Sequence, residues 1–92
     1  MIIGCCQIEI HLPMSASLKD KRRVVAGLRD RIRRHNVAFA EVDHQDVWQR
    51  AGLAIVSVAA HRPQLEALFE SIHREVSRDI PGEILQFEVD YF

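Results

Sequence analysis

The alternation of apolar and polar residues along this chain predicts six regular elements. Residues 2–12 alternate at their later end, where Ile8, Ile10 and Leu12 would share one face of a half-buried strand. Apolar residues at helical spacing predict two helices, and a nearly continuous apolar run predicts a central strand. The predicted elements are a strand at 2–12, a helix from 15 or 17 to about 35, a strand at 37–42, a strand at 53–59, a helix from 63 to about 79 and a strand at 85–91.

This order of elements, βαββαβ, is typical of the split β-α-β sandwich of ferredoxin-like type. We therefore predict an α+β fold with a four-stranded antiparallel sheet and two helices on one face, as a single domain over residues 1–92. Right-handed crossovers place the third strand between the first two. The start of the first helix and the connection between the second and third strands should then lie at the same end of the sheet.

Composition narrows the class of protein. The chain has 92 residues, of which 48% are hydrophobic and 27% charged, which is ordinary for a globular domain. No apolar run approaches the roughly 20 residues of a membrane span, and the N-terminus does not resemble a signal peptide, so we expect no membrane association and a cytoplasmic location. Cys5 and Cys6 are adjacent and should point to opposite faces of a strand, as packing thiols or, for the exposed one, as a redox group.

Charge is distributed very unevenly. Eight basic and two acidic residues lie between Lys19 and Arg34, a local net charge of +6, whereas the rest of the chain carries −7. On a helix, several of these basic residues share one flank, which could follow the phosphates of an RNA or could simply be a solvated surface. The candidate nucleic-acid-binding residues are Lys19, Arg22, Arg23, Arg29 and Arg33.

Lys21 differs from these because its helical position falls within the apolar stripe. A buried ammonium needs a carboxylate partner, and Glu41, Asp43 and Asp46 are available at that end of the sheet. A structural ion pair and an active lysine both fit this position. Together with its neighbours it forms a predicted sheet-end polar cluster: Lys21, Glu41, Asp43, His44, Asp46, Trp48 and Arg50.

His44 stands between two acids and could act as a general base or as a metal ligand. However, no second His or Cys follows at a metal-binding spacing, and no nucleophile accompanies it in a motif. We therefore predict no catalytic residue, metal or cofactor. The simpler interpretation is a turn with local hydrogen bonds, in which Trp48 closes the end of the core.

The predicted third strand is apolar on both faces, although this fold covers only one. Leu53 and Ile55, or Ala54, Val56 and Val58, would remain exposed in a monomer. We therefore expect a homodimer, with Gln7, Glu9, Glu88 and Asp90 forming an acidic region on or beside the open face. The central strands lack the aromatic residues with which RNA-recognition motifs stack bases, so RNA would be bound by charge and shape.

Two long motifs, Ser17-Leu18-Lys19-Asp20-Lys21-Arg22-Arg23-Val24 and Glu41-Val42-Asp43-His44-Gln45-Asp46-Val47-Trp48-Gln49-Arg50-Ala51, resemble those of the YlxP-like bacterial family, known as domain of unknown function 503. The resemblance spans essentially the whole chain. It implies a ferredoxin-like fold and dimers, and genes that often neighbour those of translation initiation and ribosome maturation. It implies no reaction and no catalytic residues.

Three hypotheses follow from the sequence. The first is a binding protein that contacts RNA or a ribosomal particle through the basic first helix. The alternative is a dimeric regulatory module that holds a small ligand or protein partner near His44, Asp46 and Trp48. The third is an acid-base enzyme that uses His44 and Asp46.

Overall fold

A computed structural model describes residues 1–92 and contains six regular elements in the predicted order. Their bounds are β1 (Ile2–His11), α1 (Leu18–Ile32), β2 (Ala38–Asp43), β3 (Arg50–Ala59), α2 (Arg62–Asp79) and β4 (Glu83–Tyr91). None of the helices is both long enough and apolar enough to cross a membrane.

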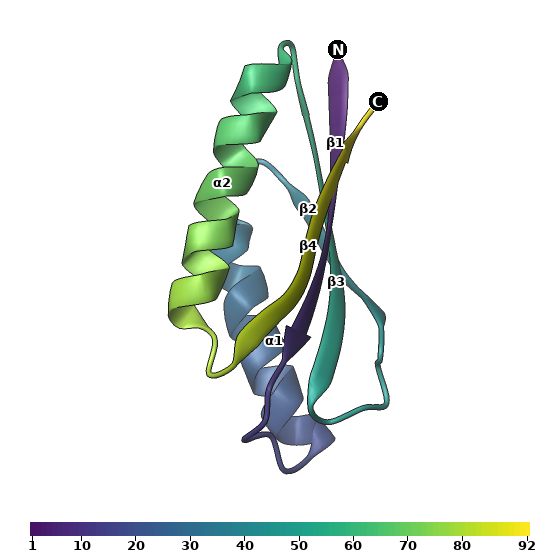
Figure 1. The fold of residues 1–92 in the computed structure, drawn as a ribbon, viewed down its shortest axis with the longest axis vertical. Coiled ribbons are helices and arrows are strands. Elements are labelled where there is room, and N and C mark those ends of the chain that lie inside the picture. Colours follow the sequence, from purple (N-terminus) through teal and green to yellow (C-terminus); the bar gives the residue numbers. More distant parts are fainter.

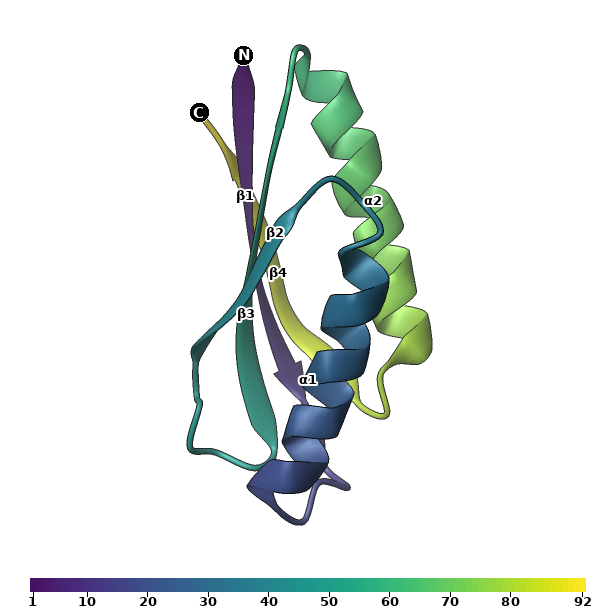
Figure 2. The ribbon, with the colours of Figure 1, turned by 180° about the vertical axis from the view of Figure 1, so that it is seen from behind.

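The four strands form one antiparallel sheet in the order β2-β3-β1-β4. Both helices lie on the same side of this sheet, and the opposite side carries no helix (Figure 1). The view from behind shows the same two layers, with α1 beside β2 and α2 extending toward the β3–α2 turn (Figure 2). The predicted α+β arrangement of ferredoxin-like type is confirmed, including the position of the third strand next to the first two.

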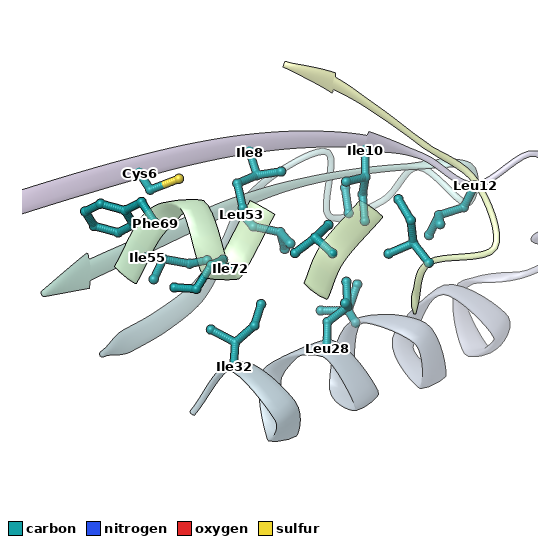
Figure 3. Packing of buried hydrophobic residues seen from close by; sticks show 14 of the residues in the cluster. Cys6, Ile8, Ile10, Leu12, Leu28, Ile32, Leu53, Ile55, Phe69 and Ile72 are labelled. Carbon is teal, nitrogen blue, oxygen red and sulfur yellow. The ribbon is translucent and has the colours of Figure 1, made fainter. Parts of the chain in front are cut away.

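The hydrophobic core fills the space between the sheet and the helices. It is one cluster of 15 buried residues, and Figure 3 shows Ile8, Ile10 and Leu12 of β1 facing Leu28 and Ile32 of α1. The predicted alternation in β1 is thus confirmed, because these three side chains share the covered face.

Close packing of α2 against the sheet depends on a glycine in β1. A β-carbon at Gly4 would lie 2.5 Å from Cε2 of Phe69 and 3.2 Å from Cδ1 of Leu65. The absent side chain lets the Phe69 ring rest directly on the strand backbone. This contact contributes to holding the N-terminal half of α2 on the sheet.

Some element boundaries differ from the predicted ones. The first helix ends at Ile32 rather than near His35, because the backbone N–H groups of Arg34 and His35 donate to carbonyls three residues earlier, which tightens the last turn. Strand β3 begins at Arg50 rather than at Leu53, since residues 50–52 continue the pairing with β1. Strand β4 similarly begins at Glu83, which pairs with His11.

Candidate functional site

Lys21 is buried in the apolar stripe of α1, as its helical position predicts. The helix begins after Ser17, whose hydroxyl accepts a hydrogen bond of 3.1 Å from the backbone N–H of Asp20. From there Lys21, Val25 and Leu28 follow one another on the side that faces the sheet. Only 1% of Lys21 is exposed, so its ammonium group must find all its partners within the protein.

The Lys21 ammonium binds the start of β3 and the connection that precedes it. Its Nζ donates hydrogen bonds to the carbonyl oxygens of His44 at 2.7 Å, Gln45 at 3.1 Å and Arg50 at 3.3 Å. Oε2 of Glu41 lies 3.0 Å from the same nitrogen. Since an ammonium group has three protons and three carbonyls receive them, the carboxylate is held mainly by charge. Lys21 therefore fixes the backbone of the β2–β3 connection.

A β-bulge explains why Glu41, of the three predicted carboxylates, is the partner of Lys21. The pairing of β2 with β3 shifts between Glu41 and Asp43, which leaves Val42 as an extra residue. Glu41 pairs with Leu53 and faces the helices, whereas Asp43 pairs with Gly52 on the open side. A β-carbon at Gly52 would lie only 2.7 Å from Cβ of Asp43, so this glycine permits the bulge.

His44 belongs to a second set of contacts, on the open side of the sheet. Its φ of 57° is in the left-handed region and turns the chain directly after β2. The connection then arches away from the helices, as both views show (Figures 1 and 2). Nε2 of His44 contacts Oε1 of Glu9, and the other oxygen of Glu9 lies 2.9 Å from Nη2 of Arg50. Glu9 on β1 thus bridges His44 and Arg50.

Asp46 and Trp48 do not join these contacts. Neither forms an ion pair or side-chain hydrogen bond with the rest of the predicted cluster, and 52% of Trp48 is exposed. The prediction that Trp48 closes the end of the core is wrong, because it lies in the connection between β2 and β3 with half of its surface exposed. The buried Leu12 occupies that end instead. Its backbone N–H donates a hydrogen bond of 2.8 Å to the carbonyl oxygen of Gln49.

In the predicted sheet-end polar cluster, the group with chemical potential is the imidazole of His44, which Glu9 orients. Both carboxylate oxygens of Glu9 are engaged, and Nδ1 of His44 has no partner within the protein. The carboxylate that contacts the imidazole is that of Glu9, which the sequence analysis placed only in an acidic region of the open face, and not that of Asp46. No group of three or more His, Cys, Asp or Glu side chains is arranged to hold a metal ion. No local sequence signal pointed to Glu9, because its position opposite Gly52 and near His44 follows only from the folded register.

The five basic residues proposed for nucleic-acid contact all lie exposed on α1 or directly after it. Arg33 follows the last helical residue with helical backbone angles and donates its N–H to the carbonyl of Arg29, so it continues the same flank. Arg29 forms a long ion pair of 3.7 Å with Asp30. The remaining members, Lys19, Arg22, Arg23 and Arg33, form no ion pair. We call these five residues the basic ridge.

The two cysteines point to opposite faces of β1, as predicted. Cys6 is fully buried in the core, whereas Cys5 is partly exposed on the open face. Burial raises the pKa of the Cys6 thiol from 9.0 to about 12, and the neighbouring Cys5 adds to the rise. Cys6 is therefore a packing residue with an inert thiol.

The element order and the one-sided sheet define an α+β protein of ferredoxin-like arrangement, with a lysine-anchored connection at one end. Residues 3–89 match the family described as "Protein of unknown function (DUF503)", and the chain belongs to this family. It is also 35% identical over 66 residues to the "Uncharacterized protein YlxP" of Bacillus subtilis (strain 168), an alignment that covers 71% of this chain and 72% of that protein. The predicted family is thereby confirmed.

The contacts of Lys21 predict a large loss of stability when its charge is removed. In Lys21→Met, three carbonyls and Glu41 lose their cation, and breaking such a buried pair costs about 3 kcal/mol or more. Chemical denaturation measures this loss. The control Lys19→Met removes an exposed charge and should change the free energy of unfolding by about 0.5 kcal/mol or less. Equal effects of the two variants would show that Lys21 does not anchor the connection.

The burial of Cys6 predicts slow reaction with thiol reagents in the folded protein. A pKa of about 12 instead of 9.0 lowers the thiolate fraction at pH 8 about a thousandfold. In Cys5→Ser, which retains only Cys6, a chromogenic disulfide reagent should react about a thousandfold faster after unfolding than before. Cys6→Ser serves as the control, since its remaining thiol is partly exposed. Comparable rates for Cys5→Ser in the folded and unfolded states would contradict the assignment.

Proposed function

We propose that this protein binds RNA, free or within a ribosomal particle, through the basic ridge of α1. The observation that carries the proposal is the exposure of five basic side chains on one helix, four of them without an acidic partner. From Arg22 to Arg33 the ridge extends about 16 Å, at 1.5 Å per residue. Such a row matches a phosphate backbone, whose affinity comes from exposed lysine and arginine side chains.

The second helix provides the comparison that favours binding over mere solvation. Helix α2 carries three arginines and four acidic residues, and its charges are partly paired, as in Arg62 with Glu66 and Arg78 with Asp79. Both helices belong to the same small protein and cover the same sheet face. The mixed charges of α2 are sufficient to keep a helix surface in contact with water. The basic ridge carries charges of one sign, which suits an anionic partner.

A small ligand near Trp48 is less well supported. The hollow beside Trp48 is lined only by the consecutive residues Asp46, Val47, Trp48 and Gln49, so it is the surface of one loop. Pockets that hold small molecules are concave and bring together residues of several elements. We infer a binding protein rather than an enzyme, and we place it in the cytoplasm, where RNA is accessible to it.

Reversing the ridge should abolish RNA binding. In the triple variant Arg22→Glu, Arg29→Glu, Arg33→Glu, the phosphates would meet carboxylates instead of guanidinium groups. We expect the affinity for fluorescein-labelled ribosomal RNA fragments, measured by anisotropy at low salt, to fall at least about a hundredfold. The wild-type affinity should itself fall steeply with salt, with a slope of about −0.7 for each phosphate contacted on a single strand.

A matched control exists on α2. The variant Arg62→Glu, Arg74→Glu, Arg78→Glu changes the net charge by the same amount on the other helix. It should keep most of the wild-type affinity. Equal losses of affinity in both triple variants would show that binding depends on net charge and not on the basic ridge. If the wild type does not bind RNA at low salt, the proposed function is refuted.

We also propose that two copies associate through the open face of the sheet. Register pairs Ile3 with Val58 and Cys5 with Val56 on this face, and Val56 and Val58 are 36% and 48% exposed. We call Ile3, Cys5, Ala54, Val56 and Val58 the open-face patch. A second copy could cover it while both basic ridges remain outside, since α1 lies on the opposite side of the sheet.

The open-face patch gives a direct test of association. Introducing charges with Val56→Asp and Val58→Asp should shift the protein from dimer to monomer in sedimentation equilibrium, because an unpaired carboxylate is costly to bury. The control Met14→Asp alters an apolar residue that is 83% exposed outside the sheet and should leave the dimer intact. A monomeric wild type at high micromolar concentration would disprove the association.

A further inference from the structure

A groove runs between α1 and the outer edge of β2, alongside the basic ridge. Its volume is about 320 Å³, at the lower end of the range for pockets that hold small organic groups. Arg22 and Arg29, two turns apart on α1, stand along one wall, and the small side chain of Ala26 lies between them. At 1.5 Å per residue the two arginines are separated by about 10 Å along the helix. The groove therefore has positive charge toward both ends and room at its centre.

The other wall comes from the edge strand β2 and contributes an aromatic ring. Phe39 is half-buried: it packs against the core and also lines the groove. Strand β2 pairs only with β3, so no further strand covers its outer side. An aromatic ring beside two arginines is the combination with which proteins bind single-stranded nucleic acids, by stacking on bases and pairing with phosphates.

Glu41 adds a hydrogen-bond acceptor to the same groove. Its Oε2 is buried 3.0 Å from Nζ of Lys21, and neither carboxylate oxygen accepts a hydrogen bond from the protein. Oε1 is therefore the oxygen that a ligand in the groove could reach. Because Lys21 compensates the charge of this carboxylate, Glu41 repels a nearby phosphate less than an unpaired acid would. A carboxylate in this position can accept a hydrogen bond from the exocyclic amino group of a base, as Glu does from N4 of cytosine.

We propose that the groove holds one unstacked nucleotide of a single-stranded RNA. The base lies against Phe39, the flanking phosphates contact Arg22 and Arg29, and an exocyclic amino group donates to Oε1 of Glu41. This inference rests on the proposed function, since it specifies that the RNA bound by the basic ridge is single-stranded and which bases are favoured. A duplex keeps its bases stacked inside and cannot supply one to the groove. Single strands are therefore preferred, and bases with an exocyclic amino group, such as cytosine, are preferred over uracil.

The base preference is tested with two matched oligonucleotides. Labelled ten-nucleotide oligo(C) and oligo(U) have the same charge and size, but uracil has a carbonyl oxygen where cytosine has its amino group. We expect wild-type protein to bind oligo(C) about fivefold to tenfold more tightly in anisotropy titrations. In Glu41→Gln, whose amide can donate as well as accept, the preference should disappear. Equal affinities of the wild type for both oligonucleotides would overturn the assignment of Glu41.

The aromatic contact is tested with a pair of phenylalanine variants. Phe39→Leu keeps an apolar side chain against the core and removes the stacking surface, so the affinity for oligo(C) should fall about tenfold. Phe87→Leu is the matched control: Phe87 is half-buried on β4, at the other edge of the sheet, and lines a different pocket. Thermal melting of each variant verifies that it is folded at the temperature of the titration.

The results separate this inference from the proposed function. If the ridge reversal abolishes binding but Phe39→Leu and Glu41→Gln change nothing, RNA follows the ridge by charge alone and the groove is not its site. If the wild type bound a duplex as tightly as oligo(C), the groove would likewise not be the site of RNA binding. If no RNA binds the wild type, both proposals fail together.

Discussion

The buried ammonium of Lys21 is the interaction on which the arrangement of one end of this protein depends. Lys21 lies on the apolar stripe of α1, and its ammonium group donates hydrogen bonds to three backbone carbonyls. Two of these belong to the β2–β3 connection and the third to Arg50 at the start of β3. An ammonium in this position has no access to water, so the connection must supply its partners. The conformation of an otherwise exposed loop is thereby tied to the register of a helix.

This anchoring separates the polar residues of the end into two groups with different surroundings. Ordinary alternation in β2 places Glu41 on the helix side, where it completes the environment of Lys21 and borders the α1–β2 groove. The bulge at Val42 then moves Asp43 to the open side, next to His44 and Glu9. One extra residue in β2 thus decides which carboxylate serves the core and which faces the surface opposite the helices.

The sequence was sufficient for the fold because alternation and helical spacing are strong in nearly every element, and the buried position of Lys21 followed from the same spacing. It was insufficient for the path of the connection. That path depends on the left-handed backbone of His44 and on the bulge before it, and neither has a local pattern strong enough to predict. Trp48 was consequently placed in the core, and the contact between His44 and Glu9 could not be foreseen, since it joins residues of two elements that only the folded register brings together.

The fold places the basic and the acidic residues of the chain on opposite sides of the molecule. The basic ridge lies on the outer side of α1, whereas Glu9, Glu88 and Asp90 lie in β1 and β4, and their register partners place them on the open face of the sheet. A polyanion approaching the protein is therefore attracted by one side and repelled by the other, which orients it before contact even though the net charge is −1. The same separation would keep the proposed association through the open-face patch from competing with the proposed RNA binding. Glu41 also borders the ridge, but Lys21 compensates its charge, so it weakens this field less than an unpaired acid would.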